Sequence, residues 1–311
     1  MNGEGQLIER IRRQVSLPRN SRIVLGIGDD CAIYRPRGSA EDLLFTTDLL
    51  VEDVHFRRIT HRAGDVGWKA LARGLSDIAA MGGEPRFFLL SLAVAGWADE
   101  GWIDGFYRGA LRLAARAGAT LVGGDLGRAD KVMCDIVVCG GVSRGRALRR
   151  DGAHAGDAIF VSGRLGGSAL GLATRQGAAW RRHLRPEPRL ALGRFLRERV
   201  QATGAMDLSD GLSIDLWRFA EASRLAAEIE APPRFAGASL EQALHGGEDY
   251  ELLFTAPPRA RVPAEFEGLP LTRIGAMRRG RPGAVLLGGE PLPPLGFDHF
   301  RRQPAPRSRV K

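Results

Sequence analysis

The feature that most constrains the fold of this 311-residue chain is a regular alternation of apolar strand-like runs and segments with helical spacing. The continuous run FFLLSLAV (87–94) predicts a buried strand, and apolar residues recur at helical spacing over 65–81. A polar, glycine-rich stretch at 143–157 separates two such sets of elements. We therefore expect an α/β (α+β) protein with two mixed α/β domains, residues 1–147 and 148–311.

The individual elements follow from periodicity and from turn residues. In the first half, we expect strands at 23–27, 43–47, 87–94, 119–124 and 132–142, and helices at 65–81 and 100–117. In the second half, we expect strands at 157–163, 226–231, 250–256, 271–277 and 283–289, and helices at 166–176, 188–201, 212–224 and 239–246.

The chain has a formal net charge of +9, which raises the question of nucleic-acid binding. The excess is almost all arginine, because the only lysines are Lys69, Lys131 and Lys311. The arginines are scattered, and no basic stripe interleaved with aromatic residues is present. The pattern favours a solvated arginine-rich surface, and we expect no nucleic-acid partner.

No run of about 18 apolar residues is present, so we expect no membrane partner. The first residues, MNGEGQLIERIRRQ, lack the apolar stretch of a signal peptide, which favours a cytoplasmic location. Cys31, Cys134 and Cys139 form no CxxC pair and are odd in number, so neither a disulfide framework nor a thiolate zinc site is expected.

Seven aspartates stand in short turns rich in Gly, Ser or Thr. They are Asp29 and Asp30 in GIGDD, Asp48 in TTD, Asp77 in LSDIAAMGG, Asp125 in GGD, and Asp207 and Asp210 in MDLSDG. Such turns let carboxylates converge, and converging hard oxygen ligands bind Mg²⁺, which in turn binds phosphates. The pattern predicts a magnesium-dependent phosphate chemistry.

Each motif alone also has a structural explanation. GIGDD and GGD are common turn sequences, and Ser209 or Asp210 can cap the helix that follows MDLSDG. An aspartate such as Asp77, amid apolar neighbours in a helix, needs a partner or a metal unless it is exposed. A lone His55 is more often structural than functional, and Glu248 in HGGEDYE fits a turn as well as a substrate site.

The nucleotide-binding motifs that rely on a lysine are missing. The sequence contains neither a GxxxxGK[ST] loop nor the HRD and DFG set of protein kinases. If the protein handles nucleotide phosphates, we expect metal-binding carboxylates to do most of the work.

Taken together and in this order, the motifs resemble the thiamine-monophosphate kinase family. The matching stretches are GIGDDCA, TTDLLVEDVHF, GWKALARGLSDIAAMGGEP, GGD, RDGAHAGD, VSGRLGGSALGL, MDLSDGL, HGGEDYELLFT and GFDHF. The resemblance implies a two-domain fold like that of aminoimidazole ribonucleotide synthetase. It also implies ATP-dependent phosphorylation of thiamine monophosphate to thiamine diphosphate, the final step of thiamine diphosphate biosynthesis. Several Mg²⁺ ions and a homodimer formed through the N-terminal domain are implied as well.

The resemblance also implies roles for individual residues. The family's Mg²⁺ ligands match Asp30, Thr46, Thr47, Asp48, Asp77, Asp125, Asp207 and Asp210. Its ATP-contacting positions match Tyr107, Gly124, Asp125, Arg150 and Ser209. Its substrate-contacting positions match His55, Glu248 and Phe297. No catalytic base is assigned, because an acceptor phosphate oxygen is already ionised at neutral pH and in-line transfer then depends on positioning and charge.

Two positions depart from the family pattern. Asp53 stands where the family usually has glycine in EGVHF, and Phe297 stands where a tryptophan is frequent. Two alternatives to the kinase remain open: another ATP-dependent enzyme of the aminoimidazole ribonucleotide synthetase type, and a non-catalytic nucleotide-binding protein.

Overall fold

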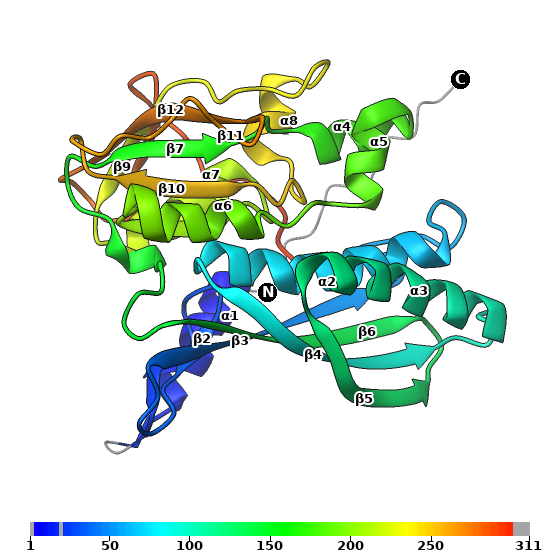
Figure 1. The fold of residues 1–311 in the computed structure, drawn as a ribbon. Helices are drawn as coiled ribbons and strands as arrows, with labels where there is room; N and C mark the ends of the chain where they lie inside the picture. Colours follow the sequence, from blue (N-terminus) through cyan, green and yellow to red (C-terminus); the bar gives the residue numbers. More distant parts are fainter. Residues whose placement is uncertain (1–2, 19–20, 301–311) are drawn as a thin grey trace, which may run out of the picture.

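The structure, a computed structural model, describes residues 3–18 and 21–300 of the chain. Two β-sheets lie one above the other, and helices fill the space between them (Figure 1). The lower sheet is built from strands before residue 144, and the upper sheet from strands after residue 157. Both sheets carry helices, so the expected mixed α/β class is confirmed.

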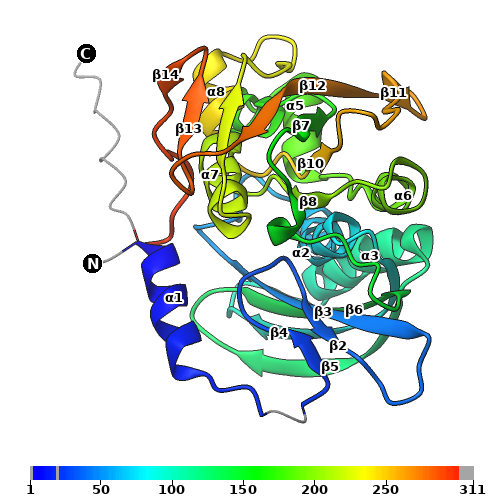
Figure 2. The same ribbon diagram turned by 90° about the vertical axis from the view of Figure 1, so that its left-hand side faces the viewer.

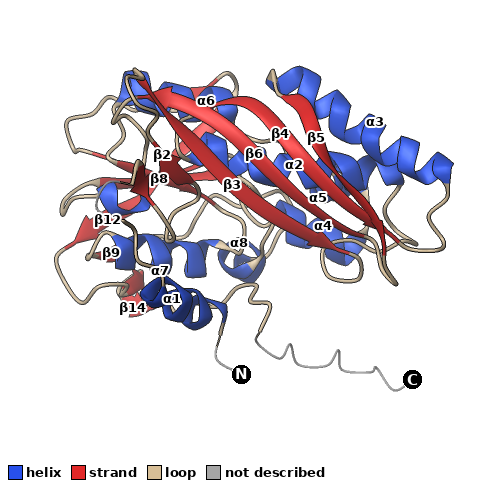
Figure 3. Ribbon diagram, turned by 90° about the horizontal axis from the view of Figure 1, so that it is seen from below, coloured by secondary structure: helices blue, strands red, loops and turns tan. Residues whose placement is uncertain are grey.

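The lower sheet has six strands within the described residues, in the order β1-β2-β3-β6-β4-β5. Its strands are β1 (Ile23–Leu25), β2 (Ala32–Tyr34), β3 (Glu41–Val51), β4 (Glu84–Val94), β5 (Thr120–Arg128) and β6 (Met133–Ser143). Only β4 and β5 pair in parallel. The helices α2 (Ala63–Ala80) and α3 (Glu100–Ala117) lie on one side of this sheet, and no helix lies over its outer side in Figure 3.

The upper sheet follows the order β14-β13-β9-β12-β7-β10-β8 in the described part of the chain, with β11 paired to β12. Its strands are β7 (Ala158–Ser162), β8 (Gly204–Asp207), β9 (Ala226–Ile229), β10 (Leu252–Ala256), β11 (Glu265–Phe266), β12 (Leu269–Arg278), β13 (Val285–Leu287) and β14 (Glu290–Pro291). Its helices are α4 (Gly167–Thr174), α5 (Gly177–Leu184), α6 (Leu190–Phe195), α7 (Leu212–Ala222) and α8 (Leu240–His245). A 3-10 turn at Arg150–Gly152 precedes β7, and a π turn at Leu196–Val200 continues α6.

Helix α2 is the central element, since it is covered on several sides at once. Glycines allow the closest approaches: a Cβ at Gly67 would lie 1.9 Å from the carbonyl oxygen of Phe106 in α3. On the other side, a Cβ at Gly193 of α6 would lie 2.0 Å from the carbonyl oxygen of Ala79. Most of α2 is therefore buried between the two sheets, and polar side chains on it need partners.

The expected strands and helices are present with small shifts in their ends, and five strands and helices were not predicted. These are α1 (Glu4–Gln14), β2, α5, β11 and β14. None of the residues of α1 is buried; it runs along one side of the molecule, where its first backbone N–H group donates to the carboxylate of Asp298 at 3.2 Å (Figure 2). α1 is mostly polar and was therefore not recognised, and β2 has only three residues.

Across the described residues, none of the helices is both long enough and apolar enough to cross a lipid bilayer.

Candidate active site

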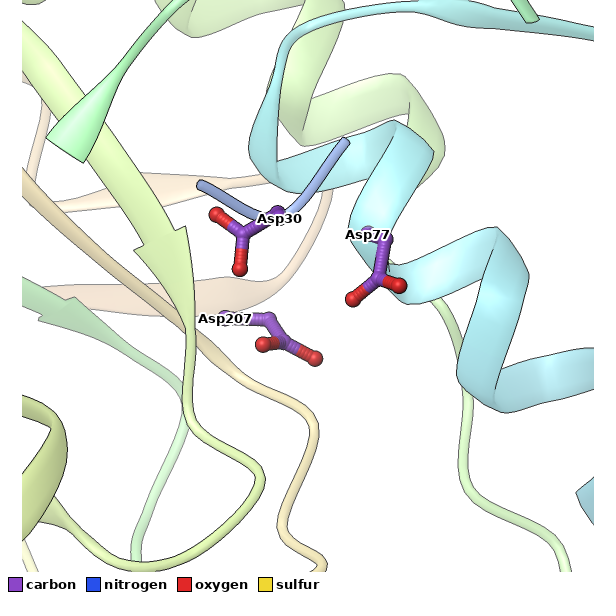
Figure 4. A group of neighbouring side chains, drawn as sticks. All are labelled: Asp30, Asp77 and Asp207. Carbon is purple, nitrogen blue, oxygen red and sulfur yellow. The ribbon is translucent and has the colours of Figure 1, made fainter. Parts of the chain in front are cut away.

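Three aspartates from distant parts of the sequence converge where the two sheets face each other (Figure 4). Asp30 lies in the loop between β1 and β2, Asp77 on α2, and Asp207 at the end of β8. One carboxylate oxygen from each lies within 4.8 Å of the others. We call these three residues the acidic cluster. The convergence that the turn motifs predict is therefore present for three of the seven aspartates.

Neighbouring hydroxyl groups hold two members of the acidic cluster in place. The Ser76 hydroxyl donates to Asp207 Oδ2 at 2.7 Å, and the Thr46 hydroxyl donates to Asp77. Ser76 and Asp77 are adjacent on α2, so this one helix turn contacts both the lower and the upper sheet. The sequence motif LSD is thus explained by its place between the two halves.

Arg150 closes one side of the acidic cluster. Its guanidinium group forms an ion pair with Asp30, and its backbone N–H donates to Asp29 Oδ2 at 3.1 Å. The second oxygen of Asp30, Oδ2, is buried and has no hydrogen-bond partner. A buried carboxylate oxygen without a partner is costly, and a bound cation would satisfy it.

The pKa values of the carboxylates in and beside the acidic cluster also favour a bound cation. Burial, together with repulsion from Asp48 and the rest of the cluster, raises the pKa of Asp77 well above its usual value. Burial and the charge of Asp30 raise the pKa of Asp207 likewise. The neighbouring Asp29 has its pKa raised to about 7 by burial and by Asp30. These carboxylates need positive charge before they can all be ionised together.

A pocket of about 800 Å³ adjoins the acidic cluster and extends away from it. Asp48 and Asp210 also line the pocket. Each is paired with an arginine: Arg73 lies 2.8 Å from Asp48, and Arg218 lies 2.5 Å from Asp210. The structure therefore places positive side chains beside two of the predicted metal ligands.

The three predicted substrate residues line the same pocket. His55, Glu248 and Phe297 come from the segment after β3, the segment before β10 and the C-terminal segment, respectively. The rings of His55 and Phe297 are 6.4 Å apart between centroids, and His55 Nδ1 accepts a hydrogen bond from the Val51 backbone N–H at 3.0 Å. The pocket thus brings one carboxylate and two rings together.

The backbone conformation at position 53 explains how an aspartate can stand where the family usually has glycine. Asp53 has a φ of 67°, in the left-handed region that glycine adopts most easily. Its carboxylate lies 2.9 Å from the Lys131 ammonium group on the surface. Aspartate is among the side chains that tolerate this conformation, so the loop keeps the turn before His55 without glycine.

The remaining predicted residues lie apart from the acidic cluster, except for Ser209, which lines the pocket. Thr47 points to the outer side of the lower sheet, where its hydroxyl donates to Asp135 at 2.7 Å. Asp125, after Gly124 on the edge strand β5, is exposed, and its carboxylate accepts a hydrogen bond from the next backbone N–H. Tyr107 is half-buried on α3. The roles of these residues stay predictions.

Sequence reasoning missed two basic residues of the site, Lys69 and Arg73. Together with Asp77 they recur every four residues along α2, which places all three on one face of the helix. Lys69 is fully buried, and Arg73 donates to Asp48. The signal was available in the sequence, because charged residues at this spacing in an otherwise apolar helix indicate a polar contact.

Comparison with known proteins places this chain in a family. Residues 28–142 match the family model described as AIR synthase related protein, N-terminal domain. The chain is 39% identical over 328 residues to thiamine-monophosphate kinase of Escherichia coli (strain K12), covering 96% of this chain and 98% of that protein. It is 36% identical over 311 residues to the enzyme of Bacillus subtilis (strain 168), covering 91% and 95%. The chain belongs to the thiamine-monophosphate kinase family.

Solved structures of thiamine-monophosphate kinases agree with this assignment. "AaThiL complexed with AMPPCP and TMP" matches with a TM-score of 0.83 at 33% identity, over 96% of this chain and 97% of that one. The kinase from Stenotrophomonas maltophilia K279a matches with a TM-score of 0.74 at 41% identity, over 92% and 97%. The hydrogenase maturation protein HypE in complex with ATP shares only the fold, at 20% identity. The expected resemblance and fold are therefore confirmed.

Proposed function

We propose that this protein phosphorylates thiamine monophosphate with ATP, giving thiamine diphosphate and ADP, by direct in-line transfer. The observation that carries the proposal is the acidic cluster, two of whose members line a pocket that is also lined by His55, Glu248 and Phe297. The family membership supports the choice of substrates, since a relative of this fold is described with an ATP analogue and TMP.

We propose Mg²⁺ as the metal, held by the acidic cluster and by further members of the predicted set. The unpartnered Asp30 Oδ2 and the raised pKa values of Asp77 and Asp207 support this proposal, because a divalent cation with oxygen ligands would satisfy both. When bound, Mg²⁺ supplies positive charge that offsets the repulsion between two anionic phosphates and helps to align them.

The protein's own residues supply the remaining charge and the positioning. Arg150 holds Asp30, and Arg73 and Arg218 hold Asp48 and Asp210, so three guanidinium groups lie close to where phosphates would bind. The acceptor phosphate is ionised at neutral pH, so no side chain has to remove a proton from it. Catalysis then rests on orientation and on preorganised charge.

The outer side of the lower sheet supports the proposed homodimer. Within the described residues it is not covered by a helix, and large apolar residues are exposed on it: Leu49 of β3 and Leu89 of β4 are 53% and 38% exposed. An apolar sheet face of this kind is typical of a protein interface. We propose that residues 1–147 form the ATP- and Mg²⁺-binding and dimerisation domain, that residues 148–311 form the second domain, and that the enzyme acts in the cytoplasm, where ATP is available.

The direct test is product formation from thiamine monophosphate, ATP and Mg²⁺. We expect thiamine diphosphate and ADP in equal amounts, and no product when EDTA replaces Mg²⁺. Chromatography of both products checks the stoichiometry. A folded sample that binds ATP but leaves thiamine monophosphate unchanged would indicate a different acceptor.

Buried carboxylates next to the predicted metal ligands also predict how stability responds to pH and metal. Asp29 and Asp215 have pKa values raised to about 7 by burial and by neighbouring carboxylates, so they lose their protons in the folded state as the pH rises through 7. A carboxylate whose pKa is higher in the folded than in the unfolded state makes the folded protein less stable as the pH rises through the folded-state pKa. We therefore expect the increase in melting temperature caused by Mg²⁺, relative to EDTA, to grow between pH 5.5 and pH 8.5. Thermal unfolding at both pH values checks this, and a Mg²⁺ effect that is constant or shrinks would contradict it.

A further inference from the structure

The buried lysine Lys69 has no role in the mechanism above, yet it joins two residues of the substrate pocket. Its side chain is 0% exposed at the centre of α2. Its Nζ donates to Glu248 Oε2 at 2.8 Å and to the backbone carbonyl oxygen of His55 at 3.2 Å. Since a lysine is almost never fully buried without a partner, this pair is a specific feature of the site.

Glu248 is held by its backbone as well as by Lys69. Its φ of 64° lies in the left-handed region, and its N–H donates to the Ser209 carbonyl oxygen at 2.6 Å. Non-glycine residues in this conformation are uncommon and collect at ligand sites. One carboxylate oxygen, Oε2, is used by Lys69, while Oε1 is buried and has no partner. Glu248 is thus fixed in place with one acceptor atom left over.

Several titratable groups face Glu248 from the surrounding elements. They are Lys69 and Arg73 of α2, His183 of α5, His55 and His61 from the segment before α2, and Tyr250 of its own segment. Burial raises the pKa of Glu248, but Lys69 and then His183 and Arg73 outweigh burial and lower it to about 2. Burial lowers the pKa of His61 to about 4 and that of His183 to about 3.

At neutral pH, this end of the pocket therefore holds a balanced Lys69–Glu248 pair and uncharged imidazoles. The end with the acidic cluster and its arginines is strongly charged by comparison. Thiamine monophosphate has the same polarity, with an anionic phosphate at one end and a neutral aminopyrimidine ring at the other. The ring carries an amino group, which donates hydrogen bonds and needs an acceptor.

Resting on the proposed function, we propose that Lys69 is a positioning residue that keeps Glu248 ionised and oriented as the hydrogen-bond acceptor for the amino group of the substrate's pyrimidine ring. Arg73 is oriented toward Asp48 and the Leu49 carbonyl oxygen, so it cannot replace Lys69 in this contact. Loss of the lysine would leave a buried carboxylate that takes up a proton, and a protonated carboxyl no longer offers the same acceptor.

The test is Lys69→Met, which keeps the length of the side chain and removes its charge. We expect the KM for thiamine monophosphate to rise at least about 30-fold at pH 6.5, while the KM for ATP stays within about twofold. The ratio of the KM of the variant to that of the wild type should fall as the pH rises to 8.5, because Glu248 then ionises without its lysine. Using this ratio removes the substrate's own ionisation from the comparison.

A double variant, Lys69→Met with Glu248→Gln, covers the case in which the single variant folds poorly. It has no buried unpaired charge, so its melting temperature should stay close to that of the wild type. We expect its KM for thiamine monophosphate to remain raised about 10-fold and to show no added pH dependence, because the amide does not titrate. The matched control is Arg278→Met, which removes an exposed cation paired with Glu228 and should leave both KM values unchanged.

An analogue of the substrate identifies the group that is recognised. Oxythiamine monophosphate has oxygen in place of the amino group, and the wild type should use it at least about 100-fold less efficiently than thiamine monophosphate, whereas Lys69→Met should lose most of this discrimination. Unchanged discrimination in both variants, or an equal rise in the KM for ATP, would overturn the proposal for Lys69. A wild type that forms no thiamine diphosphate would instead overturn the proposed function on which it rests.

Discussion

Asp207→Asn should lower kcat for thiamine diphosphate formation by at least about 1000-fold without unfolding the protein. Asp207 is buried in the acidic cluster, where its carboxylate accepts a hydrogen bond from Ser76 at 2.7 Å. An asparagine oxygen can still accept that bond, so the local packing is kept. What is lost is one negative charge of the set that would hold Mg²⁺.

Thermal stability distinguishes a loss of Mg²⁺ binding in Asp207→Asn from a loss of folding. Because Asp207 is repelled by Asp30, the asparagine variant in EDTA should unfold at the same temperature as the wild type or at a higher one. The rise in melting temperature on adding Mg²⁺ should be much smaller than in the wild type. The matched control is Asp104→Asn on the exposed side of α3, which should change neither kcat nor the Mg²⁺ effect. Near-normal turnover of Asp207→Asn would remove Asp207 from the metal site.

Glu251→Ala should destabilise the protein by about 3–5 kcal/mol, the largest stability effect we expect from one side chain. The carboxylate of Glu251 is 0% exposed and lies 2.7 Å from Arg182 and 2.6 Å from Arg189, while the Ser162 hydroxyl donates to it at 2.5 Å. Removing it leaves two guanidinium groups, each only 18% exposed, without their main partner.

Chemical denaturation of wild type and variant at the same Mg²⁺ concentration measures this difference. Glu41→Ala is the matched control, because Glu41 forms an ion pair of similar length with Arg86, at 2.7 Å, but both side chains are about half-exposed. We expect the control to cost less than about 1 kcal/mol. Equal losses in the two variants would mean that burial does not strengthen the Glu251 contacts.

The fold could be predicted from the sequence wherever an apolar period is strong. The helix at 100–117 agrees with α3 at both ends, helped by a side-chain cap at Asp99 and a glycine in the left-handed conformation at Gly118. α1 has few apolar residues and buries none of them, and β2 has only three residues, so neither was recognised in the sequence. The order of the strands in each sheet depends on long-range pairing, which local patterns do not contain.

In the site, too, local sequence patterns predicted some residues, whereas contacts that depend on tertiary packing were missed. Glycine-rich turns and family resemblance singled out Asp30, Asp77 and Asp207, and the structure brings these three together. The arginine partners were not predicted, since Arg218 reaches Asp210 across two turns of α7 and Arg73 reaches Asp48 from another element. The spacing of charged residues along a helix can indicate that Arg73 makes a polar contact, but the partner in an ion pair between elements depends on tertiary packing and cannot be identified from the sequence.

Helix α2 has one more consequence for which molecules the pocket can accept. Lys69, which contacts Glu248 and His55, and Asp77 of the acidic cluster are eight residues apart on the same face, so about 12 Å of helix separates these two positions. Because this helix is packed on several sides, the distance between these two positions cannot adjust to the ligand. The helix therefore selects for ligands of a fixed length. A phosphorylated compound much shorter than this distance would contact only one of the two positions. Inserting a single residue into α2 between them would rotate Lys69 and Asp77 about 100° away from each other around the helix axis.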